Sequence, residues 1–139
     1  FLRIAGDLFF LHPWAGFGET RFERFAVPPA VLAYASRVAL RTAFEAGFHN
    51  EMVTSAIRAG VPGLLAATAT FLVPLYIPGP RLKSGQPVVR ANATLGVTFV
   101  LCMLVSSLST EVFDLKYTVS YYALMVAVLC GSALAPRHE

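Results

Sequence analysis

Three long stretches of the sequence carry no charged side chain. Residues 59–80, 91–110 and 117–136 run for 22, 20 and 20 residues without Asp, Glu, Lys or Arg. Each reaches the roughly 20 apolar residues that carry a helix across a bilayer. The chain is 56% hydrophobic and only 14% charged, whereas an average soluble protein is about 25% charged. These features argue against a soluble globule and a disordered chain, and they predict an all-α, polytopic membrane protein built as a helical bundle.

The pattern of charge divides the chain at about residue 58. Residues 1–58 mix both signs of charge with moderately apolar faces, which is typical of helices lying on a membrane surface. They are expected to form an extracytoplasmic, interfacial helical segment, and residues 59–139 are expected to hold three membrane-spanning helices. Prolines, glycines and charged turns put these helices at about 61–78, 91–109 and 118–135. The sequence opens at Phe1 without a Met or a signal-peptide pattern, so we expect it to be the C-terminal part of a longer polytopic protein.

The two short loops differ in charge, which predicts the orientation in the membrane. Residues 81–90 hold three basic and no acidic side chains, whereas residues 111–116 hold one basic and two acidic ones. Cytoplasmic loops carry an excess of Lys and Arg. The 81–90 loop and the C-terminus are therefore expected in the cytoplasm, with residues 1–58 on the opposite side.

Two motifs precede the first uncharged run. Residues 11–18 read Leu-His-Pro-Trp-Ala-Gly-Phe-Gly, and His49-Asn50 is followed, after nine residues, by Gly-Val-Pro-Gly at 60–63. In this order and spacing they resemble the His-Pro-x-x-Gly-x-Gly segment and the His-Asn motif of the O-antigen ligase and O-antigen polymerase superfamily of bacterial membrane glycosyltransferases. The resemblance covers residues 1 to about 78.

The resemblance implies a multi-spanning enzyme of the GT-C type in the bacterial inner membrane, with its active site facing the periplasm. Such enzymes move a glycan from undecaprenyl diphosphate to an acceptor hydroxyl without a metal or another cofactor. The implied partners are the carrier-linked glycan, a lipid A core acceptor and membrane lipid, with no nucleic acid. The glycine spacing favours a ligase, which uses the lipid A core of lipopolysaccharide. A polymerase, which joins carrier-linked repeats, is the alternative.

The same resemblance assigns roles to individual residues. The essential histidine falls on His49, and an arginine for the carrier diphosphate falls on the helix that holds Arg3. Arg37 and Arg41, one helical turn apart, are further candidates because a guanidinium binds phosphate oxygens bidentately. Asn50 completes the substrate-binding candidates. Because a helix is expected to start just after His49, its positive end disfavours the imidazolium form and suits a phosphate, so His49 is expected to accept a proton near neutral pH.

Each of these residues also has a purely structural interpretation. The His-Asn pair fits a helix cap, and Arg3 fits an i,i+4 ion pair with Asp7. Arg37 and Arg41 fit contacts with lipid headgroups.

Two other features bear on the class of site. Gly60 and Gly63 are expected to let a neighbouring helix approach closely. The spacing of His49 and Glu51 matches the His-x-Glu of zinc deaminases, but no Cys-x-x-Cys accompanies it, so no metal site is expected. The alternative from another class is a non-enzymatic membrane transporter subunit, which the absence of charge in the three spans disfavours.

Overall fold

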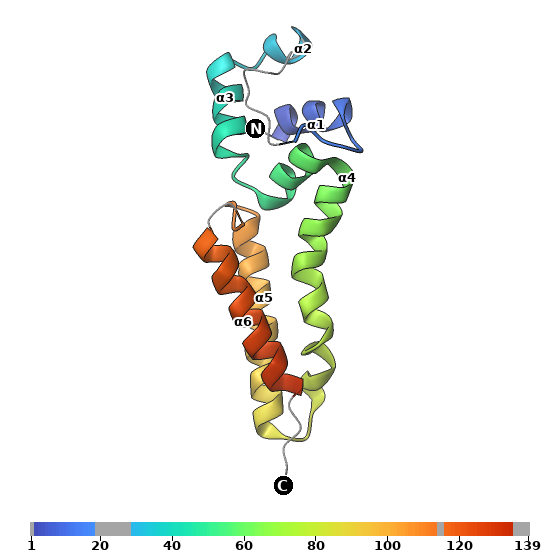
Figure 1. Ribbon diagram of the computed structural model, residues 1–139, viewed down its shortest axis with the longest axis vertical. Coiled ribbons are helices and arrows are strands. Elements are labelled where there is room, and N and C mark those ends of the chain that lie inside the picture. Colours follow the sequence, from blue (N-terminus) through green and yellow to red (C-terminus); the bar gives the residue numbers. More distant parts are fainter. Residues whose placement is uncertain (1, 19–28, 114–115, 135–139) are drawn as a thin grey trace. The chain divides into compact units, whose positions relative to one another are not determined.

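The computed structural model describes residues 2–18, 29–113 and 116–134 (Figure 1). Every regular element in these parts is helical, which confirms the all-α prediction for them. The elements are α1 (Leu2–Leu11), α2 (Pro29–Leu32), α3 (Arg37–Ala46), α4 (Glu51–Leu72), the 3-10 helices η2 (Val73–Tyr76) and η3 (Gly79–Lys83), α5 (Pro87–Ser107) and α6 (Lys116–Leu134). Residues 19–28 of the predicted interfacial segment, and residue 135 at the end of the third predicted span, lie outside the described residues.

Three helical stretches are long and apolar enough to cross a membrane. They are Glu51–Lys83, which joins α4 to the two 3-10 helices, and the helices α5 and α6. Large apolar side chains on them are exposed, among them Leu65, Leu95, Val105 and Leu124. A helix of a soluble protein turns its apolar stripe inward, whereas these outward faces suit contact with lipid. The first of these stretches begins ten residues earlier than the expected span, because α4 includes the short helix expected before Gly60.

The described residues group into two compact units. The first contains residues up to 67 together with 108–111, and the second contains 68–107 together with the residues from 112 onward. The core of the first unit is formed by buried apolar side chains from α1, from α2 and the turn after it, from α3, and from α4 with the residues before it. These are Ile4, Ala5, Leu8, Val31, Ala35, Leu40, Ala43, Phe48 and Ile57. Because this core includes Phe48, it fixes the chain next to His49.

The second unit is built on α5 and α6, which run side by side (Figure 1). Ala93, Gly96 and Val100 are buried on one face of α5. A Cβ built on Gly96 would lie 3.6 Å from the Cβ of Leu129 on α6. Small side chains at this spacing let two helix backbones approach closely in a membrane. The pairing of the two helices thus follows from the small residues on α5.

A proline near the end of the α4 helical run sets a second contact in this unit. Pro74 has no N–H, so the carbonyl of Thr70, four residues earlier, lacks its usual helical donor. The Tyr122 hydroxyl of α6 donates to this carbonyl at 2.7 Å. The Tyr122 ring also packs against Phe71 and Phe113. Tyr122 therefore supplies the hydrogen bond that the proline removes and joins α6 to the end of α4.

Candidate functional site

The two motifs of the sequence analysis are joined by backbone hydrogen bonds in the first unit. The N–H groups of Phe17 and Gly18 donate to the carbonyls of Ile57 and Arg58, at 2.8 and 2.7 Å. The N–H of Val61 donates to the carbonyl of Pro13 at 2.7 Å. The loop after α1 therefore lies along α4 at the position of the Gly-Val-Pro-Gly motif.

These bonds replace the ones that α4 loses at its break. In an unbroken helix, the carbonyls of Ile57 and Arg58 would accept from the N–H groups of residues 61 and 62. Residue 62 is a proline without an N–H, and Gly60 has φ 65° and ψ −152°, outside the helical region. The helix is thus interrupted at Gly60. The loop of residues 12–18 takes over the backbone groups that the interruption leaves unpaired.

Glycines make this close approach possible. A Cβ on Gly60 would lie 2.4 Å from the Pro13 oxygen, and one on Gly16, which has φ 63°, would lie 2.5 Å from the Arg58 oxygen. A Cβ on Gly63 would lie 2.3 Å from the oxygen of Ser55, which precedes it by eight residues in α4. The expectation that Gly60 and Gly63 admit a neighbouring helix is therefore wrong. They admit the loop after α1 and the preceding turns of α4 itself.

The part of α4 before the break at Gly60 begins at Glu51. His49 lies directly before Asn50, the cap of this helix. The Asn50 Oδ1 accepts from the N–H of Val53 at 3.1 Å, which confirms that Asn50 caps α4. Its Nδ2 donates to the carbonyl of Leu108 at 3.0 Å. His49 is exposed and has φ 54°, the left-handed region that residues with a Cβ rarely adopt. The structure thus presents the His49 side chain on a constrained loop at the start of α4.

The candidate arginines lie on two other helices of the same unit. The guanidinium of Arg3 on α1 stacks over the ring of Tyr34, 4.5 Å from its centroid, and the Tyr34 hydroxyl donates to Asp7. Tyr34 thus contacts both residues of the expected ion pair, Arg3 and Asp7. The hydrogen bond to the Asp7 carboxylate raises the pKa of Tyr34, so this hydroxyl remains a donor at neutral pH.

Arg37 and Arg41 lie on the exposed side of α3. Ser36 caps this helix by accepting from the N–H of Ala39 at 3.1 Å. Arg37 follows directly and is exposed. The Nε of Arg41 donates to Glu45 at 2.8 Å in an exposed i,i+4 pair. Exposed pairs of this kind contribute little to stability. Both arginine side chains are exposed to solvent.

Two acidic side chains are buried near the His-Asn loop, and sequence reasoning missed Glu111 and the burial of Glu51. Glu51 is 7% exposed and Glu111 is 9% exposed. The Oγ of Ser55 donates to Glu51 at 3.2 Å, and the hydroxyl of Thr54 donates to Glu111 at 2.6 Å. No signal in the sequence separates Glu111 from the other charged residues of the 111–116 turn. Glu51 puts a carboxylate in the first turn of α4, where it competes with the phosphate expected at that helix end.

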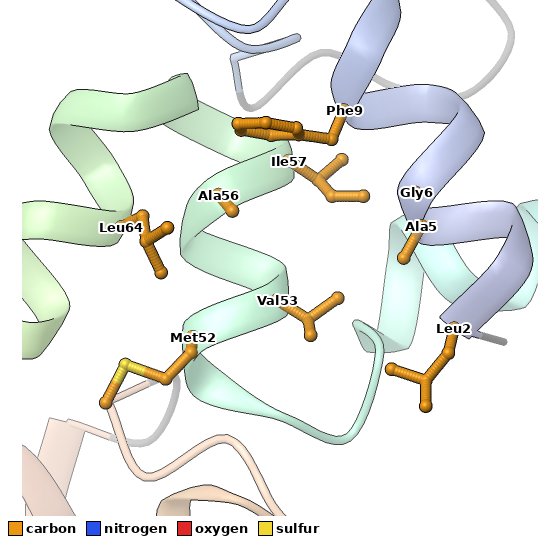
Figure 2. Close-up of a pocket in the computed structure, with 9 residues that line it drawn as sticks. All are labelled: Leu2, Ala5, Gly6, Phe9, Met52, Val53, Ala56, Ile57 and Leu64. Carbon is orange, nitrogen blue, oxygen red and sulfur yellow. The ribbon is translucent and has the colours of Figure 1, made fainter.

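An apolar pocket of about 290 Å³ opens in the first unit between α1 and the start of α4 (Figure 2). Its walls carry only apolar side chains and one glycine. They are Leu2, Ala5, Gly6 and Phe9 of α1, and Met52, Val53, Ala56, Ile57 and Leu64 of α4. Met52 lies only three residues after His49, so the pocket is close in sequence to the candidate catalytic loop.

Comparisons with known proteins add no relative. No protein-family model, no curated protein and no solved structure matches the chain. Within the described residues, no three His, Cys, Asp or Glu side chains come together as ligands for a metal ion. The chemical interpretation of the site therefore depends on the geometry of the two motifs and on the residues around His49.

Proposed function

We propose that the protein is a membrane glycosyltransferase of the O-antigen ligase type, which transfers a glycan from undecaprenyl diphosphate to the lipid A core of lipopolysaccharide. The observation that carries the proposal is the set of three backbone hydrogen bonds between residues 12–18 and the break in α4. The resemblance depends on two motifs separated by about thirty residues of sequence. Their direct contact supports treating them as parts of one site.

In this proposal His49 is the general base. The acceptor hydroxyl oxygen attacks the anomeric carbon of the carrier-linked sugar, and the bond from that carbon to the diphosphate breaks. The hydroxyl proton passes to the imidazole of His49, and undecaprenyl diphosphate leaves with the bonding electron pair. The exposure of His49 supports this role, since a base must come within hydrogen-bond reach of the proton that it removes.

In this proposal the neighbouring helices bind the diphosphate and the prenyl chain of the carrier. Arg3, Arg37 and Arg41 supply positive charge for the diphosphate, and Asn50 supports the loop next to it. The apolar pocket between α1 and α4 suits part of the prenyl chain, since its lining offers no hydrogen-bonding side chain. Burial of a hydrocarbon segment there is favourable by roughly 25 cal/mol for each Å² removed from water.

The direct test uses the purified full-length protein in detergent or nanodiscs. We expect it to transfer polymerised glycan from undecaprenyl diphosphate to a lipid A core acceptor, and to do so equally well in EDTA. Polymerised donor and core acceptor distinguish a ligase from a polymerase, which would instead extend single carrier-linked repeats. The absence of transfer to either acceptor would contradict the proposal, and loss of transfer in EDTA would contradict its metal independence.

The proposed location is the bacterial inner membrane, with the His49 loop in the periplasm. Single cysteines in a protein lacking Cys102 and Cys130 test this orientation. Ser84→Cys, in the basic loop, is expected to resist an impermeant thiol reagent in intact cells because the loop faces the cytoplasm. Thr110→Cys, which is exposed beyond α5, is expected to react. Labelling of position 84 and protection of position 110 would reverse the orientation.

A further inference from the structure

The short segment after α5 packs against the loop that carries His49. Leu108 accepts a hydrogen bond from Asn50 through its carbonyl, at 3.0 Å. Glu111, three residues further on, lies against Gly47, because a Cβ on that glycine would fall 1.5 Å from the Glu111 Oε1. The φ of Gly47 is 77°, a backbone conformation that is also unfavourable for a residue with a side chain. The segment after α5 thus contacts Gly47 before His49 and Asn50 after it.

The hydroxyl of Thr54 connects Glu111 to the backbone beside His49. It accepts from the N–H of Phe48 at 3.1 Å and donates to the Glu111 Oε1 at 2.6 Å. A hydroxyl has a single proton, so donation to the carboxylate turns its lone pairs toward the Phe48 N–H. Glu111 therefore orients Thr54, and Thr54 fixes the Gly47–Phe48 peptide, one residue before His49.

The conformation of His49 requires such support. Its φ of 54° is unfavourable for a residue with a side chain. A conformation of this kind costs of order 1–3 kcal/mol and persists only where its surroundings impose it. The hydrogen bonds of Phe48 and Asn50 hold the chain on each side of His49 and contribute to this support.

The burial of Glu111 does not stabilise the fold. It is 91% buried, since only 9% of it is exposed, and its Oε2 has no hydrogen-bond partner among the described residues. A buried carboxylate that is only half satisfied opposes folding, and an apolar side chain of similar volume would commonly be more stable. A half-satisfied carboxylate at this place therefore points to a role other than stabilisation of the fold.

We infer that Glu111 and Thr54 are positioning residues, which hold the His49 imidazole in the orientation that proton transfer requires. The inference rests on the proposed function, because it assigns the pair to the transfer step. Both side chains are buried, so the role assigned to them involves no contact with the substrates. Their effect is on the geometry of His49 and therefore on kcat rather than on binding of the carrier.

A double-mutant cycle in the full-length protein tests the pair. Thr54→Val and Glu111→Ala are each expected to lower kcat about ten- to hundredfold with little change in KM, because small misplacements of a catalytic group are costly. The double variant should be no slower than the slower single variant, since both break one chain of contacts. Thr54→Ser and Glu111→Gln, which keep the hydroxyl and an acceptor oxygen, should restore most of the rate.

The matched control is Thr42→Val on α3, which removes a hydroxyl that donates to the Val38 carbonyl at 3.0 Å, away from this chain of contacts. It should transfer glycan at the normal rate. Additive losses in the double variant, a rise in KM without a fall in kcat, or normal kcat in Thr54→Val would overturn the inference. Thr54→Val is nearly isosteric, so the test does not depend on whether Glu111→Ala folds.

A second measurement separates this inference from the proposed function. The rate at which diethyl pyrocarbonate modifies His49, followed on its peptide by mass spectrometry, reports the environment of the exposed imidazole without any transfer. We expect this rate to change severalfold in Thr54→Val and Glu111→Ala but not in Thr42→Val. Changed reactivity in a protein that transfers no glycan would contradict the function alone. Normal transfer with unchanged reactivity and kcat would contradict the positioning role alone.

Discussion

Replacing His49 with Asn is expected to lower the rate of glycan transfer about a thousandfold, the usual contribution of a positioned general base. Asn is chosen because it tolerates the left-handed conformation better than most residues, and His49 has φ 54°. The variant thus removes the basic nitrogen with little disturbance of the loop. His49→Ala is expected to lose as much activity, with a small additional cost in stability from the strained backbone. The measurement is kcat with carrier-linked glycan and lipid A core, at expression and thermal stability equal to those of the unchanged protein.

The second histidine among the described residues provides the matched control. His12 packs edge to face against Phe17, with ring centroids 4.9 Å apart, so His12→Phe keeps an aromatic ring there and should retain most of the activity. In a His49→Gly variant, added imidazole should restore part of the rate, because His49 is exposed and the glycine leaves room for the free base. Transfer by His49→Asn at the normal rate would show that His49 is not the base.

The helices of this protein follow closely from its sequence. Uncharged runs long enough to cross a bilayer became the three candidate spans, and the cap expected at Asn50 is present. These features are local. They depend on the hydropathy of consecutive residues and on a side chain that bonds three residues away, so periodicity and composition suffice to predict them.

The surroundings of His49 do not follow from the sequence in the same way. Glu111 reaches the His-Asn loop from a position about sixty residues later, and nothing in its neighbours distinguishes it from a charge in a solvated turn. Gly60 meets the loop after α1, not a neighbouring helix. A glycine in a sequence indicates that something comes close, but only the tertiary structure identifies the partner.

Substitution of Gly60 by Ala is expected to produce the largest loss of stability. The backbone of Gly60, with φ 65° and ψ −152°, lies in a region essentially reserved for glycine. A Cβ would lie 2.4 Å from the Pro13 oxygen and 2.7 Å from the Trp14 carbonyl carbon, and backbone atoms cannot yield as a flexible side chain does. The strain together with loss of the Val61–Pro13 hydrogen bond should cost about 3 kcal/mol, which is roughly a hundredfold in the opening equilibrium.

Hydrogen–deuterium exchange measures how often the loop of residues 12–18 separates from α4. The amides of Phe17, Gly18 and Val61 donate the bonds between the loop and α4, so all three should lose protection together in Gly60→Ala. The same substitution at Gly6 on α1 is the matched control, because a Cβ there meets nothing within 4 Å and alanine is favoured over glycine inside a helix by about 1 kcal/mol. Gly6→Ala should therefore keep or raise the stability of the same unit. If Gly60→Ala kept all three amides protected, the loop would not depend on the break in α4, and the contact on which the proposed function rests would lose its physical basis.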